Sequence, residues 1–524
     1  MAEEIKAYEL AKKQREISVS EFFTKNRHLL GFDNPARALM MTVKEAVDNS
    51  LDAIMETDVL PDIKIEIKQL SESRFRVIVE DNGPGIVKEQ IPQIFGKLLY
   101  GSKFHTLKQN RGSQGIGISA SVMYSQLTTG KPTKITSKIH PKKPAHYYEL
   151  TIDTKKNEPL IVKEDVVEWN NDHGTRVEIE LEAKYMKGKQ SVDEYIKQTA
   201  IVNPYASIHY ISPEGEQIEF LRVTKELPLK PRAIKPHPHG IELGILIAML
   251  QDTKATTLQS FLQSDFSRIG SKTAKEICFA AKIYERARPS RIAQQEAEAL
   301  FKALQEAKVI SPPTDCLSPI GQELLEAGLK KEIDAEFYIT ATRPASVYRG
   351  FPFVVESGII YGGNIDKESQ VRLMRFANRV PLLYQQGACA ITEAVMETNW
   401  RPYGLQQSAN SLPYGQVIIA VHIASVWVPF TSEAKEAIAH YPEIIKEIKL
   451  ALQECGRKLS THINKTVRAR ELQEKISLFE KYIPELASSL SSLSNVKKEK
   501  IEDDLRKILK KSKTSIIEEN GQTS

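Results

Sequence analysis

Glu45 and Asn49 lie four residues apart in the segment KEAVDNSLDA, and their types and spacing are the first indication of chemistry in the chain. On a helix, side chains at positions i and i+4 lie on the same face, so a carboxylate and an amide with this spacing can contact a single ligand. Such a pair suits a general base that stands beside a metal ligand. The alternative is a solvated helix face, which is the commoner explanation for a polar stripe taken alone.

Periodicity predicts the helix that would carry this pair. Apolar residues recur at steps of three and four positions, and a second stripe of polar residues accompanies them. The apolar positions are Leu39, Met40, Val43, Val47, Leu51 and Ile54, and the polar positions are Glu45, Asn49, Asp52 and Glu56.

A carboxylate at the end of a predicted strand is the next candidate. The segments that begin at Ile63 and Phe75 alternate apolar and polar residues, which predicts two strands, and the second continues into DNGPGI. Asp81 at this point can accept a hydrogen bond from an exocyclic amine, while Gly83 and Gly85 permit close approach of a ligand. An ordinary Asp-Asn-Gly turn is the alternative explanation.

A glycine-rich loop supplies a third element. Gly112, Gly115 and Gly117 lie in RGSQGIGISASVMYSQL, which becomes an apolar periodic run and so predicts a helix. A helix N-terminus after such a loop presents unpaired N–H groups and the positive end of the helix dipole, which together bind phosphate. No strand leads directly into the loop, and the Gly-Lys-Ser/Thr ending of a P-loop is absent, so we expect phosphate binding of another type.

The order of these motifs resembles a known family. The polar helix, the strand that ends in Asp-x-Gly-x-Gly and the glycine lid are followed by HGTRVEIEL, in which Thr175 opens a strand. This order is similar to the GHKL nucleotide-binding fold of gyrase B subunits, MutL proteins, the large heat-shock chaperone and sensor histidine kinases. The segments EFFTKNRHLLGFDNPARAL, FGKLLYGSKF and KPHPHG resemble more closely the B subunits of the type IIB DNA topoisomerases, the topoisomerase VI family, over most of the chain.

The resemblance implies a role for each candidate in an ATP site. Glu45 would be the general base that activates the attacking water, Asn49 would hold a Mg²⁺ ion on the phosphates, and Asp81 would bind the adenine amino group. Thr175 would help to seat the adenine. Ser119 stands where relatives often have lysine. Further contacts would come from Gly83 and Gly85, from Ser102 and Lys103 on the phosphate side, and from the lid residues Gly112, Ser113, Gln114, Gly115, Ile116, Gly117, Ile118 and Ser119.

A cation for the terminal phosphate is expected from far downstream. The segment QVIIAVHIASVWVPF predicts a long strand, and Lys435 follows it in TSEAKEAIA, where it opens a predicted helix. In the resembled family a lysine at this place reaches from a second domain to the terminal phosphate and couples nucleotide state to domain angle. A point charge on a flexible stem suits that role. Relatives commonly carry glycine where this chain has Ala434, and an exposed helix lysine is the alternative.

The length and the segment pattern predict a multidomain α+β protein. A chain of 524 residues exceeds a single core. The resemblance implies four parts: a GHKL ATPase α/β sandwich with an N-terminal strap, a helix-two-turns-helix insert, a transducer domain with a right-handed βαβ crossover, and a helical C-terminal tail. Their expected bounds are 1–230, 236–310, 311–470 and 471–524, and Pro442 is expected in the first turn of a helix.

The helical insert contains a candidate contact to DNA phosphate. The segment FSRIGSKTAKEI places Ser271 as an expected N-cap, with Lys272 and Lys275 close by. A capped helix start beside two lysines could hold a phosphate of DNA. A capped helix with solvated lysines is an equally good alternative.

An aromatic and basic cluster is a second candidate for DNA contact. Trp400, Arg401 and Tyr403 in NWRPYG resemble a short motif that the family associates with DNA. Aromatic faces beside a guanidinium can contact sugar and bases while the charge meets phosphate. An aromatic pair at the edge of a core is the alternative, because Trp and Tyr are often half-buried.

Histidine and cysteine provide little indication of a metal centre. His237 and His239 lie in a proline-rich connector without other ligands nearby, so we interpret them as part of the connector. The four cysteines are isolated, so zinc is not expected and a reducing compartment is the simplest interpretation. They are Cys278, Cys316, Cys389 and Cys455.

Composition and charge indicate an intracellular protein. The formal charge of +5 is too small to establish nucleic-acid binding by itself. The N-terminus is polar and charged rather than an apolar signal core, and no segment is long enough to cross a bilayer. We therefore expect a soluble cytoplasmic protein without a membrane partner, and the resemblance to DNA topoisomerase subunits implies that it is associated with the nucleoid.

The resemblance also implies a function. ATP and Mg²⁺ would order the lid and bring two copies of the chain together through their ATPase domains, which closes a clamp on double-stranded DNA. Lys435 would report the nucleotide state toward an A subunit, in an A2B2 assembly, and that subunit would cut the second duplex so that supercoils relax and catenated DNA separates. The chain alone is not expected to cleave DNA, because it lacks the EGDSA-like acidic segment and the DxD of gyrase B.

Other GHKL classes are the alternatives. A chaperone or a MutL-type clamp would share the pocket but not the helical insert or the flanking segments. A histidine kinase would need a phosphoacceptor histidine helix, and none is visible before Glu45.

Overall fold

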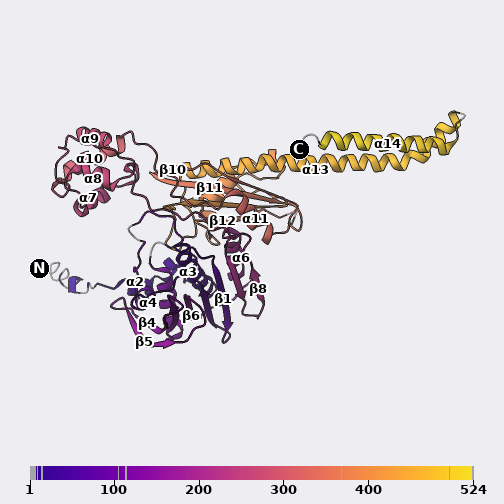
Figure 1. The fold of residues 1–524 in the computed structure, drawn as a ribbon. Coiled ribbons are helices and arrows are strands. Elements are labelled where there is room, and N and C mark those ends of the chain that lie inside the picture. The colour runs from indigo at the N-terminus through magenta and orange to yellow at the C-terminus, as the bar shows by residue number, and fades with distance from the viewer. Residues whose placement is uncertain are drawn as a thin grey trace. The chain divides into compact units, whose positions relative to one another are not determined.

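The computed structural model describes residues 8, 10–12, 14, 16–103, 106–112, 115–366, 369–494 and 496–521, with side chains up to residue 510. The chain divides into two compact units. The first contains Met1–Trp400 and Leu405–Cys455, and the second contains Arg401–Gly404 and Gly456–Ser524. In Figure 1 the colour follows the chain from indigo at the N-terminus to yellow at the C-terminus. The helices and strands confirm the predicted multidomain α+β class.

An eight-stranded sheet forms the centre of the N-terminal part. Its strand order is β5-β4-β3-β6-β2-β1-β7-β8, and neighbouring strands are antiparallel except for β1 and β7. The strands are β1 Asp62–Gln69, β2 Arg74–Asp81, β3 Thr133–Lys138, β4 Ala145–Asp153, β5 Glu158–Val167, β6 Gly174–Glu182, β7 Ser207–Ile211 and β8 Gln217–Phe220. The helices are α2 Val19–Lys25, η1 Arg27–Leu30, α3 Pro35–Met55, η2 Lys88–Gln90, α4 Ile91–Gly96, α5 Gly117–Thr129 and α6 Val192–Val202.

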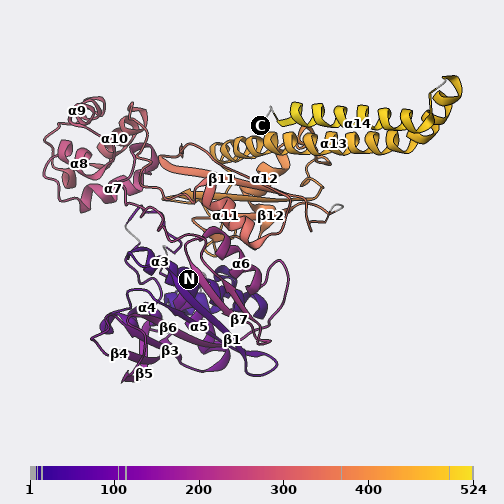
Figure 2. The same cartoon turned by 45° about the vertical axis from the view of Figure 1, so that its right-hand side comes forward.

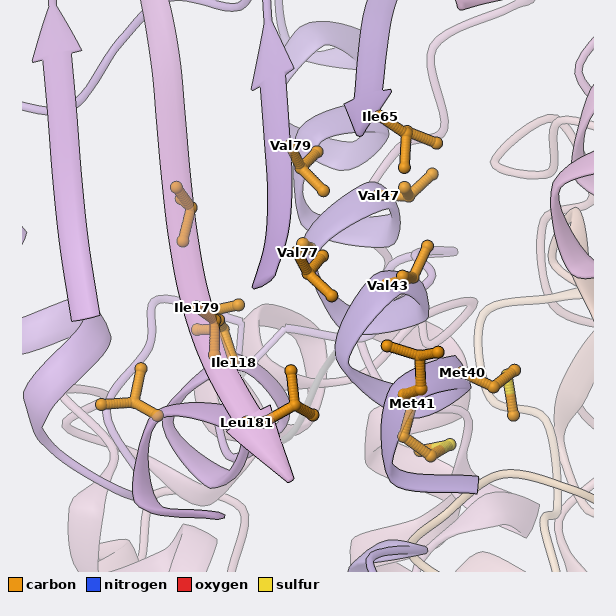
Figure 3. Packing of buried hydrophobic residues seen from close by; sticks show 14 of the residues in the cluster. Met40, Met41, Val43, Val47, Ile65, Val77, Val79, Ile118, Ile179 and Leu181 are labelled. Carbon is orange, nitrogen blue, oxygen red and sulfur yellow. The ribbon is translucent and has the colours of Figure 1, made fainter. Parts of the chain in front are cut away.

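Helix α3 forms as its periodicity predicts. The side chain of Asn34 caps its N-terminus, and every predicted apolar position on it is buried. Figure 3 shows Val43 and Val47 of this helix beside Val77 and Val79 of β2. Burial of each such side chain contributes on the order of 2 kcal/mol. Because the apolar stripe packs on the sheet, the register of the polar residues on α3 is fixed relative to the strand ends.

The turn after β2 is held by its asparagine. Asn82 accepts a hydrogen bond from the backbone N–H of Asp62 at 2.9 Å and donates to the carbonyl of Leu60 at 3.0 Å. The antiparallel register of β2 and β6 pairs Asp81 with Thr175. The predicted strands are confirmed here, and their register brings two predicted adenine-binding residues side by side.

Four helices that follow the first sheet in the sequence pack around a small hydrophobic core of their own. They are α7 Leu243–Asp252, α8 Leu258–Asp265, α9 Ser271–Ala280 and α10 Gln294–Glu306, with η3 Pro238–Gly240 and η4 Pro289–Arg291. Figures 1 and 2 show them gathered in one group. Buried residues such as Phe261 and Leu300 belong to one hydrophobic cluster in this group. The predicted cap at Ser271 is wrong because α9 begins one residue earlier, so that Gly270 is the N-cap. Oγ of Ser271 instead accepts a hydrogen bond from Gln259 at 3.1 Å.

A second sheet follows the helical module. Its order is β10-β11-β14-β12-β13, and β9 also pairs with β11. Strands β12 and β14 are parallel, and α12 lies between them in sequence, as the predicted crossover requires. The handedness of this crossover stays a prediction. The elements are α11 Gln322–Glu332, β9 Phe337–Thr342, β10 Ser346–Tyr348, β11 Phe351–Tyr361, β12 Arg372–Ala377, β13 Val380–Pro381, η5 Gln386–Ala388, α12 Ala390–Glu397 and β14 Val417–Ser425.

Long helices form the C-terminal part. Helix α13 spans Pro442–Leu493 and begins at the predicted proline, and α14 spans Lys498–Gly521. Within the second unit, α14 runs beside the part of α13 that follows Gly456 in both views (Figures 1 and 2). The short helix η6, Arg401–Tyr403, belongs to the same unit, and a β-carbon added to Gly456 would lie 2.6 Å from the ring of Tyr403. The predicted helical tail is therefore confirmed for the residues that the structure describes.

Candidate functional site

A cavity of about 630 Å³ lies against α3, the turn after β2 and the first turn of α5. Its volume is in the range of small-molecule sites. Apolar side chains from three elements, including Met41, Phe95 and Val177, form part of its wall. The predicted site residues that line it are Glu45, Asn49, Asp81, Gly85, Ser102, Lys103, Gly112, Gly115, Ile116, Gly117, Ile118, Thr175 and Lys435.

Glu45 lines the cavity next to a buried lysine. Nζ of Lys44 lies 3.2 Å from Oε1 of Glu45 and 3.0 Å from Oδ2 of Asp48. Burial alone would lower the pKa of Lys44, but the carboxylates of Asp48 and Glu45 outweigh it and raise that pKa. Oε2 of Glu45 lies against Gly117 at the start of α5, where an added β-carbon would overlap it. The carboxylate is thus held by a cation on one side and by the lid helix on the other.

Asn49 presents its amide to the cavity one helical turn later. Its side chain is exposed and makes no hydrogen bond with the part of the chain that the structure describes. A β-carbon added to Gly112 would lie 3.6 Å from Oδ1 of Asn49, so the amide faces the beginning of the lid. This amide oxygen is available to a ligand on the same helix face as Glu45.

Asp81 is a buried acceptor with three hydrogen-bond donors of its own. Oγ of Ser50 donates to Oδ2 at 2.7 Å, and the backbone N–H groups of Gly83 and Thr175 donate to Oδ1 at 2.8 and 3.2 Å. Burial raises the pKa of Asp81, and these hydrogen bonds oppose that change. Ser50 was not predicted, because one serine beside the polar stripe has no periodic signal of its own.

The glycines of the turn have different steric roles. Gly85 has φ +70°, and a β-carbon there would overlap the carbonyl of Lys138. A β-carbon at Gly83 would lie 2.8 Å from Oδ1 of Asp81. Gly85 lines the cavity, whereas Gly83 is not among the residues that line it. Oγ of Ser137 joins this turn to β6, since it accepts a hydrogen bond from the backbone N–H of Ile86 at 2.8 Å and lies 3.1 Å from Oγ1 of Thr175.

The glycine loop leads into α5 as predicted. Gly115 has φ +56° and the helix begins at Gly117, so the first N–H groups of α5 lie at the cavity. Ser119 lies in the first turn, but its side chain is buried and donates to the carbonyl of Ile116 at 2.9 Å. Ser119 is not among the residues that line the cavity, and its contact with a ligand stays a prediction. Ser113 and Gln114 lie outside the described residues.

A buried ion-pair cluster supports the beginning of the lid. Nζ of Lys103 lies 2.6 Å from Oδ2 of Asp52, and Nη1 of Arg111 lies 3.1 Å from Oδ1. The backbone N–H of Gly112 also donates to Oδ2 at 3.2 Å. Burial would raise the pKa of Asp52, but Lys103 and Arg111 outweigh it and bring that pKa to about 2. Lys103 therefore lines the cavity while neutralising Asp52, and Ser102 lines it beside Lys103.

This cluster was not predicted from the sequence. Lys103 was expected only on the phosphate side and Asp52 only as a member of the polar stripe, and Arg111 was not a candidate. The available signal was an arginine that directly precedes the glycine loop. Its meaning depends on a carboxylate 59 positions away, which periodicity cannot supply.

Lys435 reaches the cavity from the second sheet. Its Nζ donates to the carbonyl of Arg111 at 2.9 Å. The predicted helix at this place is wrong, because residues 431–437 form a loop closed by the hydrogen bond from Thr431 N–H to the carbonyl of Ala437 at 2.9 Å, and Lys435 has φ +55°. Burial lowers the pKa of Lys435, and nearby carboxylates, Glu45 first among them, oppose that change. The lysine is a desolvated cation at the edge of the predicted phosphate site.

The three residues of the aromatic and basic cluster, Trp400, Arg401 and Tyr403, differ in their exposure to solvent. Trp400 is fully buried, and its Nε1 donates to the carbonyl of Val395 at 2.7 Å. The predicted DNA contact of Trp400 is therefore wrong, since a ring without exposed surface cannot stack on a base. Arg401 is exposed and Tyr403 is half-buried, so their contact with DNA stays a prediction.

The histidines of the connector bind backbone groups. Nε2 of His237 lies 3.1 Å from the carbonyl of Ile310, and Nε2 of His239 lies 3.0 Å from that of Ala307. These contacts join the two ends of the helical module. The four cysteines are all buried thiols.

The described residues contain no candidate membrane-spanning helix and no candidate cluster of metal-binding side chains. No helix in that part of the chain has the length and apolarity that crossing a membrane requires. Within the same residues, no group of three or more His, Cys, Asp or Glu side chains could hold a metal ion by itself.

Family models match two parts of the chain. Residues 34–185 match the model for histidine kinase-, DNA gyrase B-, and HSP90-like ATPases, and residues 312–475 match that for the transducer of the topoisomerase VI B subunit. These matches confirm the predicted GHKL and transducer folds.

Proteins that share one name in several organisms are similar to this chain. The B subunit of type 2 DNA topoisomerase 6 from Methanococcoides burtonii is 54% identical over 486 residues, which cover 93% of this chain and 78% of that protein. The proteins of the same name from Methanosarcina acetivorans and Archaeoglobus fulgidus are 51% and 47% identical. These matches cover 93% and 94% of this chain and 79% and 81% of the relatives.

Proposed function

The chain belongs to the family of type 2 DNA topoisomerase 6 B subunits, and from this premise we propose that it hydrolyses ATP in the cavity beside α3 to drive strand passage of DNA. One observation carries the proposal. A carboxylate, a free amide, a buried acceptor and the start of a helix converge on one cavity, at Glu45, Asn49, Asp81 and Gly117.

Recognition of adenine follows from the surroundings of Asp81. The Ser50 hydroxyl and two backbone N–H groups fix the carboxylate, which leaves it as an acceptor for an exocyclic amine. A base that presents a carbonyl at the same position would place two acceptors against each other. Apolar neighbours such as Met41 and Ile94 suit the faces of the ring.

Hydrolysis requires positioning and charge neutralisation more than covalent chemistry. Glu45 is the residue that can orient a water and accept its proton, because Lys44 holds one carboxylate oxygen while the other lies against α5. The first N–H groups of α5 are suited to phosphate oxygens.

A magnesium ion fits this site through the nucleotide. The amide oxygen of Asn49 is exposed to the cavity on the same helix face as Glu45, and an oxygen ligand of this kind suits Mg²⁺. When bound, the ion would neutralise charge on the phosphates.

Lys435 is the expected sensor of the terminal phosphate. It belongs to the part of the chain that carries the second sheet, yet its Nζ contacts the carbonyl of Arg111 directly before the lid. A lysine can exchange this carbonyl for a phosphate oxygen by rotation of its flexible stem. The exchange would couple the occupancy of the cavity to the position of the second sheet.

The partners follow from family membership. Relatives that are named as B subunits imply an A subunit, and we propose an A2B2 assembly in which two copies of this chain close on double-stranded DNA when ATP binds. Cleavage of DNA would then belong to the A subunit. The two family-model matches and the names of the relatives support this division of labour.

Nucleotide titration tests the ATP site directly. We expect Asp81→Asn to weaken binding of a non-hydrolysable ATP analogue by at least about tenfold in calorimetry, since an amide N–H₂ would face the adenine amine. Asp252→Asn, at the end of α7, is the matched control and should bind like the wild type. Equal affinity of Asp81→Asn and the wild type would contradict adenine binding at this cavity.

A further inference from the structure

The lid stem, which we define as residues 109–111, is tied to the part of the chain that carries the second sheet. The side chain of Gln109 exchanges two hydrogen bonds with the backbone of Ser318, at 2.8 and 3.0 Å. The carbonyl of Asn110 accepts a hydrogen bond from Nδ2 of Asn378 at 3.0 Å. The residues directly before the lid are therefore held from outside the first sheet.

Arg111 ends the lid stem, and its buried side chain is held by polar groups on or near the helices α3 and α6. Nη1 pairs with Asp52, while Nη2 donates to Oδ1 of Asn203 at 2.6 Å and to the phenol oxygen of Tyr205 at 3.0 Å. The carbonyl of the same residue accepts the hydrogen bond from Lys435. The groups that fix the guanidinium thus also fix the acceptor of Lys435.

Arg379 approaches the same phenol from the second sheet. Its Nη1 donates to the oxygen of Tyr205 at 3.3 Å, and its guanidinium lies 5.4 Å from the ring centroid. Nη2 donates to Oγ of Ser318 at 3.1 Å and to the carbonyl of Pro319 at 3.0 Å. The side chain is 2% exposed and has no carboxylate partner among the described residues. Tyr205 is therefore a shared acceptor between two buried guanidinium groups.

The backbone of Arg379 has a left-handed conformation that side-chain-bearing residues rarely adopt. Asn378 and Arg379 form the two-residue turn between β12 and β13, with φ +48° and +64°. Hairpin turns with two left-handed residues strongly favour glycine at the second position. The backbone N–H of Arg379 donates to Nε2 of His422 at 2.9 Å, which helps to hold this conformation. A strained residue whose side chain is buried at a functional contact is a candidate for a role in function.

We propose that Arg379 is a positioning residue for ATP hydrolysis. Through Tyr205 it fixes Arg111, and through Arg111 it fixes the carbonyl that holds Lys435 beside the cavity. The inference rests on the proposed function, because it needs Lys435 to act on the nucleotide. Its new content is that the second sheet aligns the lysine from both sides, by the loop that carries Lys435 and by the turn that carries Arg379.

Arg379→Gly tests the proposal without adding backbone strain. Glycine accepts the left-handed conformation freely, so the variant removes the guanidinium while favouring the turn. Arg349→Gly is the matched control, since Arg349 also has a positive φ, +43°, in the turn between β10 and β11 of the same sheet. Tyr205→Phe keeps the ring and removes only the shared acceptor.

The full chain is assayed with its A subunit and DNA. We expect Arg379→Gly and Tyr205→Phe to lower kcat for ATP by at least about fivefold, while affinity for a non-hydrolysable analogue stays within about twofold of the wild type. Arg349→Gly should retain the wild-type kcat. If Arg379→Gly does not fold, Tyr205→Phe decides the outcome alone. A wild-type kcat in either variant, provided that this variant is folded, would overturn the proposal.

A double-mutant cycle separates positioning from general destabilisation. In a Lys435→Ala background, Arg379→Gly should cause little further loss of kcat, because its effect passes through Lys435. If the loss of kcat in the double variant equals the product of the two single losses, the proposal is overturned, even if each single variant has a lowered kcat. Absence of ATP hydrolysis by the wild type would overturn the proposed function and this inference together. An unaffected Lys435→Ala variant would remove the role of Lys435 and with it this inference, and would leave ATP hydrolysis at the cavity standing. One outcome would remove only the inference. In it the wild type hydrolyses ATP, Lys435→Ala has a lowered kcat, and Arg379→Gly has the wild-type kcat.

Discussion

A β-carbon added to Gly117 would overlap the carboxylate of Glu45, because the first turn of α5 lies directly against Oε2 of that side chain. The glycine is needed here for space and not for a positive φ, since it is the first residue of a helix. The polar helix and the glycine lid, which are separate motifs in the sequence, thus meet at a single contact.

Gly117→Ala should therefore impair hydrolysis by displacing Glu45. We expect a loss of kcat of at least about tenfold, the scale of a mispositioned general base. Gly244→Ala in α7 is the control, because nothing lies within 4 Å of its added β-carbon. Steady-state ATP hydrolysis measures both variants. A Gly117→Ala variant that hydrolyses ATP at the wild-type rate would show that the contact does not set the position of Glu45.

Glu45→Ala should bind ATP and still dimerise, but turn over ATP at least about a hundredfold more slowly. The loss corresponds to about 3 kcal/mol of transition-state stabilisation. Glu72→Ala, at an exposed position in the turn between β1 and β2, should behave like the wild type. Hydrolysis and analogue-induced dimerisation are measured on the same preparations. Near-normal turnover by Glu45→Ala would exclude its assignment as the base.

Lys435→Ala should slow hydrolysis and spare the adenine end of the cavity. The reason is that its Nζ lies at the lid stem, on the carbonyl of Arg111, and not beside Asp81. We expect affinity for ADP to be nearly unchanged while kcat for ATP falls. Lys449→Ala, an ion-paired lysine on α13, is the control. Unchanged turnover in Lys435→Ala would leave the residue without a role in catalysis.

Asp52 gives the site a defined dependence on pH. Its pKa of about 2 in the folded chain lies below the ordinary value of about 3.9, so the ionised form stabilises the fold. This contribution, on the order of 2 kcal/mol, is complete above about pH 5 and is lost as the pH falls toward about 2. The difference in Tm between the wild type and Asp52→Asn should therefore stay constant from about pH 8 to about pH 5 and shrink below about pH 4.

Thermal denaturation across that range checks this behaviour, with Asp252→Asn as the control at an exposed position. A Tm difference that changes between about pH 8 and about pH 6 would point to a different titrating group.

Much of the fold could be predicted because the signals are local. The period of α3, the alternation in β1 and β2, and Pro442 at the start of α13 each lie within one segment, and the structure has them at those places. The loop around Lys435 escaped prediction because the short segment EAIA consists of residues that favour a helix. A hydrogen bond from Thr431 to Ala437 and a left-handed lysine override that preference.

The residues of the site also divide into those that local motifs predict and those that they do not. Asp81, Gly85 and the lid glycines, which line the cavity, could be predicted because a strand end and a glycine loop are local motifs. The partners of Asp52 and of Tyr205 were not found, because their contacts join residues that are distant in sequence, such as Arg111 with Tyr205, 94 positions apart. Trp400 was assigned to DNA from its neighbours in sequence, whereas its burial depends on how α12 packs.

Relaxation of a supercoiled plasmid tests most directly whether this chain uses ATP to move DNA through its partner. We predict that the wild-type chain relaxes the plasmid with an A subunit, ATP and Mg²⁺, and that neither the chain alone nor the Glu45→Ala variant with the A subunit sustains relaxation. Relaxation by this chain alone, or relaxation by Glu45→Ala at the wild-type rate, would contradict that use of ATP.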